Sequence, residues 1–426
     1  MAALTVGGSI AVPGDKSISH RTLICAALAD GTSTIRGILR SADVQSTAGA
    51  LRALGVAIPP LGDILTIRGV GLHGLRAAAT PLDCGNSGTT TRLLAGVSAA
   101  LPFETSFVGD ASLSGRPMRR VARPLEAMGA RVTLSGGGHL PMSIHGATLS
   151  PVSWASDKAS AQVKSAILLA ALVGGVKVSV SEPERSRDHT ERMLRALGAT
   201  VGVEGLTVRL SVADHLAPLD ATVPADPSSA AFFAALAALA DSGALEMPGV
   251  CVNPTRIGFF RALERMGARV SIVDQTERNG EPVGTLRVAP HSLRGVSIGE
   301  AEVPSLIDEL PLVACLASRA DGETEITGAA ELRVKESDRI ATVVANLRAI
   351  GADADELPDG MRIRGARTPL RGRVVTHGDH RIAMAFGILG AIPGNDITVD
   401  DPDCCAVSFP DFWQQLALAT QHTGRD

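Results

Sequence analysis

The chain has 426 residues, of which 45% are hydrophobic, and this length suggests two or three domains. Aromatic residues make up only 3% and tyrosine is absent, which argues against a surface that stacks the bases of single-stranded nucleic acid. The net charge of −4 excludes a global basic field for nucleic acid. Positive charge for any anionic ligand must therefore be gathered locally.

Cysteine usage and the apolar stretches indicate where the protein is found. The six cysteines contain no C-x-x-C pair, and we expect them to be buried, reduced thiols. The N-terminus lacks the basic and apolar regions of a signal peptide. The longest apolar stretch, 230–240, is shorter than the roughly 20 residues that span a bilayer. We therefore expect a soluble cytoplasmic protein with no membrane partner.

One pattern recurs five times along the chain: an amphipathic helix that ends at a glycine and is followed by a strand. The apolar residues of each copy fall at helical spacing, and the glycine stands where a helix C-cap favours a left-handed residue. The glycines of the five copies are Gly55, Gly129, Gly198, Gly267 and Gly351. Charge on one face of these helices predicts that they lie on the outside.

A second pattern recurs six times: an Ala/Leu-rich helix, a glycine turn and a β-branched strand. These copies start near Leu23, Leu93, Ile167, Phe232, Leu312 and Ile382. Because the helices are apolar nearly all round, we expect them to be buried. Six units of about 70 residues predict an α/β protein of two lobes with three units each. The Pro/Asp-rich stretch 219–227 is where we expect the chain to cross between lobes.

Three Gly-, Ser- or Thr-rich turns lead into buried helices, at 13–21, 83–92 and 160–165. Helix N-termini offer free N–H groups and a positive dipole end to anions. Lys16 and Arg21 would add full charges at the first turn. The second turn is not a Walker P-loop, because no Gly-Lys-Ser/Thr follows. Taken alone, each turn is also explained by an ordinary helix cap or a flexible loop.

Two further segments are rich in charge. In 332–339, Lys335, Glu336 and Arg339 would share a surface if they lay on one helix, although such runs are usually solvated helix faces. In 377–384, charged residues run directly into a buried helix, which favours a functional role.

Arg116 stands in a Gly-Pro turn, and Asp308 with Glu309 interrupts the apolar stretch 303–316. A carboxylate in such a place has either a partner or a task such as general-base catalysis. The ten histidines are dispersed, and no metal-binding motif is present.

Read together, six of these motifs resemble the motif series of the 5-enolpyruvylshikimate-3-phosphate synthase family, from about Val12 to Phe412. They are Asp15–Arg21, Gly85–Thr89, Arg116-Pro-Met, Ser160–Ser165, Arg333–Arg339 and Asp379–Arg381. The resemblance implies an inside-out fold of six βαβαββ-type repeats, three per lobe, with helices packed inside. It places 1–15 plus 225–426 in one lobe and 16–224 in the other, with the active site in the cleft between them.

The family pattern also implies a role for each matching residue. Catalytic roles fall to Asp308 as the base near the reacting 5-hydroxyl, Glu336 as the acid/base at the methylene carbon, Lys335 and Lys16. The shikimate 3-phosphate ligands would be Lys16, Ser17, Arg21, Ser160, Ala161, Gln162, Arg187, Asp308 and Lys335. The phosphoenolpyruvate ligands would be Lys16, Gly88, Arg116, Gln162, Arg339 and Arg381.

The implied reaction is an addition followed by an elimination that joins phosphoenolpyruvate to shikimate 3-phosphate and releases phosphate. It needs no metal or other cofactor, its partners are the two small molecules, and the usual form is a monomer. Each substrate carries a phosphate and a carboxylate, so bringing the two together costs about 4 kcal/mol or more for each close pair of like charges. Lys and Arg side chains concentrated at the site would offset that repulsion.

Four places in the sequence depart from the family pattern or bear on inhibition. Val407 stands where the family often has a Lys before Phe-Pro-Asp. With no tyrosine in the chain, Arg187 would replace an aromatic contact to shikimate 3-phosphate. The unsubstituted Gly88 leaves room for glyphosate, whereas Ser160-Ala161-Gln162 resembles a subgroup that is often less sensitive.

Two other readings remain open. The sister enzyme, UDP-N-acetylglucosamine enolpyruvyl transferase, shares the fold and reaction. It typically has a Cys in the loop before the Arg-Pro and a Lys-Asn pair, where this chain has no Cys before Arg116 and has Lys16-Ser17. A catalytically inactive repeat scaffold would have lost charged positions while keeping the apolar repeats.

Overall fold

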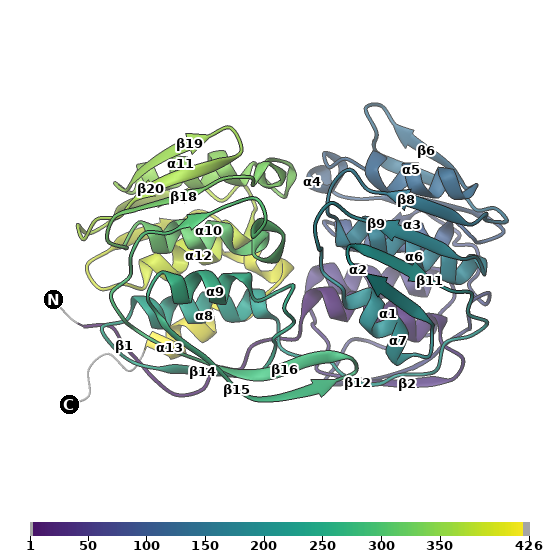
Figure 1. The fold of residues 1–426 in the computed structure, drawn as a ribbon, viewed down its shortest axis with the longest axis horizontal. Helices are drawn as coiled ribbons and strands as arrows, with labels where there is room; N and C mark the ends of the chain where they lie inside the picture. Colours follow the sequence, from purple (N-terminus) through teal and green to yellow (C-terminus); the bar gives the residue numbers. More distant parts are fainter. Residues whose placement is uncertain (1–2, 421–426) are drawn as a thin grey trace. The chain divides into compact units, whose positions relative to one another are not determined.

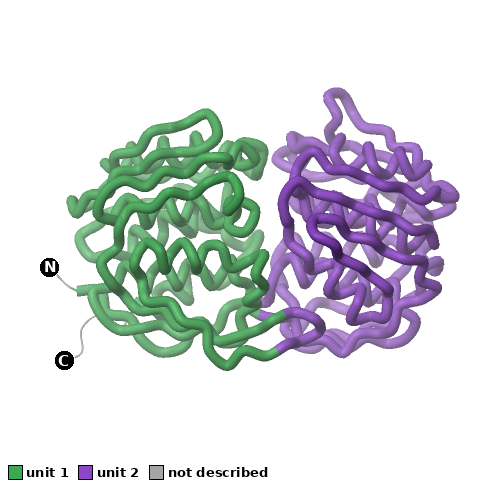
Figure 2. Tube along the Cα trace, viewed as in Figure 1, with its two compact units in different colours: residues 1–13, 225–276, 282–426 green, residues 14–224, 277–281 purple. Residues whose placement is uncertain are grey.

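The computed structural model describes residues 3–420 and shows a mixed α/β protein with two compact units (Figure 2). Unit 1 comprises residues 1–13, 225–276 and 282–426, and unit 2 comprises residues 14–224 and 277–281. Within the described residues the strands form seven small sheets, three in unit 2 and four in unit 1. The α/β class expected from the sequence is confirmed.

The short segment 277–281 belongs to unit 2, although the sequence analysis placed 225–426 in a single lobe. Two side chains of the helix at 189–196 hold it there. The Glu281 carboxylate lies 2.7 Å from His189 Nδ1, and the Gly280 carbonyl accepts a hydrogen bond of 2.9 Å from Arg192 Nη1. Contacts of this kind join residues about 90 positions apart, which no local sequence pattern reveals.

Three helices fill the interior of unit 2 (Figure 1): α1 (Lys16–Leu28), α3 (Gly88–Ser98) and α6 (Ala161–Gly174). Their Ala-, Leu- and Gly-rich sequences are buried on nearly every side. Small residues let α3 and α6 approach closely, since a Cβ on Gly96 would lie 2.2 Å from the Ala166 carbonyl oxygen. This packing fixes the N-termini of the two helices relative to each other.

Sheets and amphipathic helices cover these buried helices in unit 2. The outer helices are α2 (Ala42–Ala53), α4 (Ala111–Ser114), α5 (Arg119–Met128) and α7 (His189–Ala196). In sheet order the strands are β12 (Asp220–Thr222), β2 (Thr32–Arg36) and β3 (Ile64–Arg68); β4 (Leu82–Asp83), β5 (Glu104–Val108), β7 (His139–His145) and β6 (Arg131–Ser135); and β10 (Val201–Glu204), β11 (Thr207–Leu210), β9 (Val178–Ser181) and β8 (Val152–Ala155). Burial alternates along strands such as β2, as expected for sheets with one covered face.

Unit 1 repeats this plan around α8 (Pro227–Leu239), α10 (Leu310–Ala317) and α12 (His380–Gly390) (Figure 1). Its outer helices are α9 (Gly258–Arg265), α11 (Arg339–Ala349) and α13 (Phe412–Thr420). Phenylalanines contribute to the core where α8 meets the C-terminal part of the chain. The Phe232 and Phe412 rings, for example, pack edge to face with centroids 5.7 Å apart.

The sheets of unit 1 are small. In sheet order the strands are β1 (Thr5–Val6) and β13 (Ser242–Gly243); β14 (Leu245–Cys251), β16 (Glu281–Ala289) and β15 (Arg269–Arg278); β17 (Ser297–Ile298), β18 (Glu323–Ile326), β20 (Gly360–Arg364) and β19 (Asp353–Leu357); and β21 (Arg371–Val374) and β22 (Asp396–Val399). Four 3₁₀ turns complete the unit: η1 (Val303–Ser305), η2 (Ile307–Glu309), η3 (Ala330–Val334) and η4 (Pro402–Val407).

The helices of the two recurring sequence patterns are confirmed, but no strand directly follows Gly55, since β3 begins only at Ile64. All six Ala/Leu-rich segments form buried helices. The five glycines that close the amphipathic helices all have positive φ, between 92° and 115°. Helix α13 was not expected, because no glycine of this kind follows it.

Candidate active site

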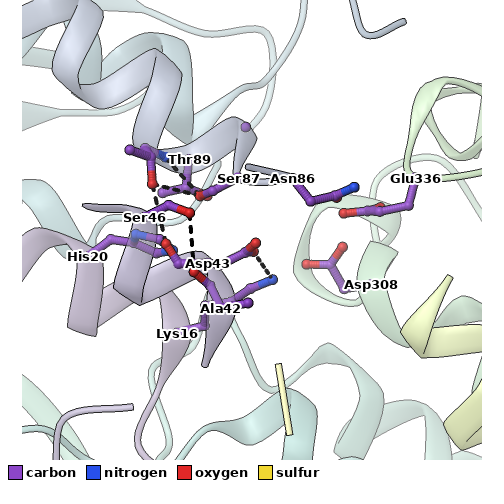
Figure 3. Close-up of polar contacts among 12 residues, drawn as sticks. Lys16, His20, Ala42, Asp43, Ser46, Asn86, Ser87, Thr89, Asp308 and Glu336 are labelled. Carbon is purple, nitrogen blue, oxygen red and sulfur yellow. Dashed lines mark hydrogen bonds and ion pairs between the residues drawn. The ribbon is translucent and has the colours of Figure 1, made fainter. Parts of the chain in front are cut away.

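Helix α1 begins at Lys16, after a turn capped by Asp15, whose carboxylate accepts from the Ile18 N–H at 2.8 Å. The Lys16 ammonium points at Asp43 in the first turn of α2, with Nζ 2.9 Å from Oδ2 (Figure 3). Both side chains are largely buried, with 16% and 8% of their surface exposed. Asp43 therefore fixes the lysine that the sequence analysis assigned to both substrates.

Arg21 lies one turn further along α1 and is only 4% exposed. Its guanidinium donates to Thr190 Oγ1 at 2.7 Å, to Ser165 Oγ at 2.8 Å and to the carbonyl of Ser17 at 2.9 Å. Burial lowers the pKa of Arg21 to about 10, against the opposing charge of Glu191. Arg21 is therefore protonated at neutral pH, and its three hydrogen bonds, one of them to Ser17, hold the guanidinium in a fixed position.

The second turn leads into α3, where Ser87 caps the helix by accepting from the Thr90 N–H at 3.1 Å. Gly88 is the first helical residue, and a Cβ there would lie 2.5 Å from Arg92 Nη1. Arg92 in turn donates to Gln162 Oε1 at 2.8 Å, across to the start of α6. The absence of a side chain at Gly88 leaves room for this link.

Arg116 lies between α4 and α5 and is 8% exposed. Its Nη2 donates to the Asn86 side-chain oxygen at 2.5 Å and to Ser112 Oγ at 3.1 Å. Asn86 belongs to the turn before α3, so Arg116 and Gly88 occupy one neighbourhood. Two of the four positions assigned to phosphoenolpyruvate in unit 2 are therefore brought together.

Helix α6 begins at Ala161, with Ser160 as its cap and Gln162 in its first turn. Gln162 Nε2 donates to Thr89 Oγ1 at 2.9 Å, so the starts of α3 and α6 are joined in both directions. The Ser160 N–H donates to Glu182 Oε1 at 2.8 Å. Arg187 lies near enough to Arg21 for its charge to lower the pKa of Arg21, after the larger effect of burial.

In unit 1 the carboxylate of Asp308 lies among three cations (Figure 3 shows Asp308 and Glu336). It stands in η2, immediately before α10, with 14% of its side chain exposed. The closest nitrogens are Arg339 Nη1 at 3.5 Å, Arg381 Nη2 at 3.7 Å and Lys335 Nζ at 4.0 Å. The attraction of these positive charges offsets the loss of hydration free energy that burial imposes on the Asp308 carboxylate.

Arg339 is 1% exposed and forms the centre of the charged cluster. Its Nε lies 2.8 Å from Asp379 Oδ2, and its Nη2 lies 2.6 Å from Glu336 Oε2. Burial alone would lower the pKa of Arg339, but the charges of Asp379 and Glu336 outweigh burial and raise it. Arg339 is therefore a permanent cation with a fixed orientation.

The charged run 332–339 does not lie on one helix. Lys335 follows η3 with an extended backbone, and α11 begins only at Arg339. Asp338 caps that helix by accepting from the Ala341 N–H at 3.1 Å, which is why the helix starts there. The Glu336–Arg339 pair forms across the cap, not along a continuous helix.

Lys335 is 28% exposed, more than its charged neighbours Arg339 and Asp308. Burial lowers the pKa of Lys335, the positive charge of Arg339 acts in the same direction, and Asp308 opposes both. A lysine of this kind can hold an anion and can also release a proton more readily than a free lysine.

Arg381 lies in the first turn of α12, whose cap Asp379 accepts from the Arg381 N–H at 3.0 Å. Its guanidinium donates to the Asp308 carbonyl at 3.2 Å and lies 3.7 Å from Glu309. The same Asp379 that holds Arg339 therefore also fixes the start of the helix that carries Arg381.

Each unit thus assembles part of the residue set expected from the sequence. Unit 2 holds Lys16, Ser17, Arg21, Gly88, Arg116, Ser160, Ala161, Gln162 and Arg187. Unit 1 brings Asp308, Lys335, Glu336, Arg339 and Arg381 into one cluster of ion pairs. Val407 lies in η4 at the C-terminal side of the same unit.

Sequence reasoning missed the acidic partners that hold these cations. Asp43 gave no signal beyond a carboxylate in the first turn of a helix. Asp379 stood inside a quoted motif but received no role, and Glu182 was not considered. Each is identified only by the side chain it contacts.

No helix in residues 3–420 is both long and apolar enough to cross a membrane. In the same residues, no three His, Cys, Asp or Glu side chains come together in a way that could hold a metal ion.

Comparison with known proteins assigns the chain to a family. The family described as EPSP synthase (3-phosphoshikimate 1-carboxyvinyltransferase) matches residues 3–416. The chain is 49% identical over 416 residues to the 3-phosphoshikimate 1-carboxyvinyltransferase of Sulfurihydrogenibium sp., with 96% of each chain covered. It is also 49% identical to the protein of that name from Xanthomonas campestris, covering 95% of this chain and 93% of the relative.

Solved structures agree with this result. EPSP synthase from Acinetobacter baumannii matches with a TM-score of 0.86 and 41% identity, covering 98% of both chains. The enolpyruvyl transferase NikO from Streptomyces tendae shares the fold, with a TM-score of 0.76 at 18% identity over 97% of this chain and 95% of its own. The resemblance read from the sequence motifs is confirmed: the chain belongs to the EPSP synthase (3-phosphoshikimate 1-carboxyvinyltransferase) family.

Proposed function

We propose that the chain transfers the enolpyruvyl group of phosphoenolpyruvate to the 5-hydroxyl of shikimate 3-phosphate, as in the shikimate pathway to aromatic amino acids. Membership of the EPSP synthase family supports this assignment. The observation that carries the residue roles is the cluster in unit 1, where Asp308 lies within 4.0 Å of three cations and Glu336 is held by Arg339.

In this proposal unit 2 binds shikimate 3-phosphate. Ser160, Ala161 and Gln162 stand at the start of α6, where free N–H groups and the helix dipole favour a phosphate. Arg187 adds a full charge there, and Arg187 replaces an aromatic contact found in some relatives. Lys16, Ser17 and Arg21 at the start of α1 hold the remaining polar groups, including the carboxylate.

The proposed phosphoenolpyruvate ligands are those that the family pattern implies. Arg339 and Arg381 offer the planar forks that suit a carboxylate, and Arg116 with Lys16 neutralises the phosphate. Gly88 and Gln162 complete the set. Val407 supplies no charge at the family's Lys position, so Lys16 and the arginines together neutralise phosphoenolpyruvate.

The two steps follow from the acid and base in unit 1. Asp308 accepts the proton of the 5-hydroxyl, whose oxygen forms a bond to C2 of phosphoenolpyruvate while Glu336 protonates C3. Glu336 then takes a proton from C3 of the tetrahedral intermediate as the C2–O bond to phosphate breaks, which restores the acid and releases inorganic phosphate. Lys335, beside Asp308, stabilises the negative charge at both stages.

We also propose that the protein is a cytoplasmic monomer. Six cysteines without a disulfide support a reducing compartment. Light scattering during size exclusion tests the monomer, since a mass well above 43.8 kDa would contradict it.

The function is tested by measuring phosphate release from phosphoenolpyruvate with either shikimate 3-phosphate or UDP-N-acetylglucosamine as acceptor. We expect release with the shikimate ester alone, and its loss in Lys335→Ala. The matched control is Lys177→Ala, an exposed lysine in unit 2. Release only with the nucleotide sugar would assign the chain to the sister reaction, and no release with either from folded protein would favour an inactive scaffold.

A further inference from the structure

One buried cation in unit 2 has no assigned role. Lys164 is the single charged residue of α6, and its side chain is 3% exposed. Its ammonium lies 2.8 Å from Glu182 Oε2 and 2.9 Å from Glu191 Oε1. Both carboxylates are as deeply buried as the lysine, with 3% and 1% of their side chains exposed.

Burying three charged side chains is unfavourable for the free energy of folding, which suggests that this triad has a function. Removing charges from water is unfavourable unless partners and hydrogen bonds compensate, and apolar residues of similar volume often stabilise a fold better. Burial alone would lower the pKa of Lys164, but the two glutamates outweigh burial and raise it. Lys164 is therefore charged at neutral pH and neutralises one of the two glutamates. The negative charge that remains also stabilises the protonated form of Arg21, through Glu191.

Glu182 links two segments that carry proposed phosphate ligands. Its Oε1 accepts from the Ser160 N–H at 2.8 Å, and its Oε2 accepts from the Ser186 hydroxyl at 2.7 Å. Ser160 begins α6, and Ser186 immediately precedes Arg187. A single carboxylate thus joins the start of the helix to the turn that carries the arginine.

Glu191 extends the same network to a third ligand. It follows Thr190 on α7, and Thr190 accepts from Arg21 Nε at 2.7 Å. Thr190 also shares a hydrogen bond of 2.7 Å with Ser165, one residue after Lys164. These contacts therefore connect the triad to the three segments that would bind shikimate 3-phosphate in this unit: the start of α1, the start of α6 and the turn that carries Arg187.

A carboxylate with no counter-charge so close to a phosphate site would repel the ligand, and its burial would also be unfavourable. Lys164 cancels that charge while leaving the two acceptor oxygens of Glu182 in use. The arrangement keeps the fixed hydrogen bonds of a carboxylate and leaves Arg187 as the effective charge facing the substrate.

We propose that Glu182, neutralised by Lys164, is a positioning residue that aligns Ser160 and Arg187 on the substrate's phosphate and so sets the preference for phosphorylated over unphosphorylated shikimate. This inference rests on the function proposed above. It adds residues that contact no substrate and act only through the ligands they hold.

The test compares kcat/KM for shikimate 3-phosphate with kcat/KM for shikimate in Glu182→Ala, at saturating phosphoenolpyruvate. Misaligned supporting groups typically cost 10- to 100-fold, so we expect a loss of about that size with the phosphorylated substrate. The value for shikimate and the KM for phosphoenolpyruvate should change little. Glu182→Gln retains an acceptor for the Ser160 N–H and should keep more of the preference.

Two further variants separate positioning from folding. Ser186→Ala removes one hydrogen bond to Glu182 but keeps the ion pair between Glu182 and Lys164, and we expect a smaller loss of preference, about 5-fold, as for one hydrogen bond. Glu184→Gln, a partly exposed glutamate in the same turn, should leave the preference unchanged. Thermal unfolding of every variant monitors the fold.

The outcomes distinguish this inference from the function itself. Equal losses with both substrates, or an unchanged preference in both Glu182→Ala and Ser186→Ala, would overturn the positioning role while leaving the enzyme assignment intact. A wild-type protein that turns over neither substrate would instead overturn the proposed function, and this inference with it.

Discussion

The two units present their proposed substrate-binding and catalytic residues in different ways. Unit 2 uses the starts of three buried helices, where hydroxyl, amide and backbone N–H groups lie beside a few cations. Unit 1 uses a dense cluster of opposite charges, in which Arg339 contacts Asp308, Glu336 and Asp379. The first arrangement suits recognition of a fixed anion, and the second suits movement of protons.

This difference predicts different responses to substitution. A site built from many hydrogen-bond donors loses affinity gradually as single donors are removed. A site built from one acid, one base and their counter-charges loses turnover abruptly when one of them is changed. Substitutions in unit 1 should therefore act mainly on kcat, and those in unit 2 mainly on the binding of the substrates.

The largest effect is expected at Glu336. Glu336→Gln keeps the size of the side chain and a contact to Arg339 but removes the proton donor, so we expect kcat to fall about 10²- to 10⁴-fold. Steady-state phosphate release measures this, with Glu331→Gln in η3 as the matched control. A kcat within a few-fold of wild type would remove Glu336 from the chemistry.

Arg339→Lys should have the next largest effect. Lysine keeps the charge but loses the fork that contacts Glu336 and Asp379 together, and breaking such a buried pair costs about 2–5 kcal/mol. We expect kcat/KM for phosphoenolpyruvate to fall about 100-fold or more. Arg348→Lys, on the exposed side of the same helix, is the control. A comparable rise in the KM for shikimate 3-phosphate would contradict the division between the units.

Gly88→Ala probes the one phosphoenolpyruvate position that lacks a side chain. The new Cβ would lie 2.5 Å from Arg92 Nη1, so that guanidinium must move, whereas the 3.7 Å to Arg116 Nη1 is an ordinary contact. We expect the KM for phosphoenolpyruvate to rise about 10-fold, as for a shift of one polar contact. Gly49→Ala in α2, where a Cβ would meet nothing within 4 Å, should be neutral. Equal behaviour of the two variants would remove Gly88 from the site.

The pH profile tests Lys335. Burial holds the pKa of Lys335 below its ordinary 10.5, so its positive charge is lost as pH rises through that lowered value. We expect kcat/KM to decline on the alkaline side below 10.5, and Lys335→Arg to move the decline upward. Arg21, with a pKa of about 10, titrates nearby. A decline that stays in place in Lys335→Arg would assign the limb to Arg21 instead.

The smallest effect concerns stability in unit 2. His20 is fully buried, its Nδ1 lies 2.6 Å from Thr47 Oγ1, and burial together with Lys16 and Arg21 holds its pKa well below 6.5. The unfolded chain therefore binds a proton that the folded chain does not, and the free energy of unfolding falls as pH drops below 6.5.

The expected loss from His20 between about pH 7.5 and about pH 5.5 is about 1.4 kcal/mol. Denaturant unfolding of wild type and His20→Gln at both pH values measures it, because the variant should lack this part of the pH dependence. His215→Gln, an exposed histidine, should keep it. Identical pH slopes in His20→Gln and wild type would show that His20 is protonated in the folded state.

Much of the fold was predictable because it repeats. The six buried helices follow from apolar residues on every side, and Gly129 or Gly351 marks a helix end that only a residue with positive φ can form easily. Helix α13 was not predicted, because no glycine of this kind marks its end. Segment 277–281 escaped because its place depends on His189 and Arg192, far away in the sequence.

The candidate site was predictable to the extent that its residues stand in local motifs. Ser160 was readable as a helix cap, and it is one; Ser87 also caps its helix, although the turn at 83–92 gave only a loop or an anion cradle as alternatives. The acidic partners could not be predicted, because each is recognised only by the lysine that it contacts in the fold. Asp43 pairs with Lys16, and Glu182 and Glu191 pair with Lys164. Periodicity describes faces of helices, whereas ion pairs between elements depend on how those faces pack.

The most direct test of the contrast between the units is calorimetric titration of shikimate 3-phosphate onto Arg187→Ala and Glu336→Gln, each compared with wild type. The account predicts that Arg187→Ala weakens binding about 10- to 100-fold, as expected for loss of a charged hydrogen bond. It predicts that Glu336→Gln binds as tightly as wild type although its turnover is lost. Wild-type affinity in Arg187→Ala, or a comparable loss of affinity in Glu336→Gln, would contradict it.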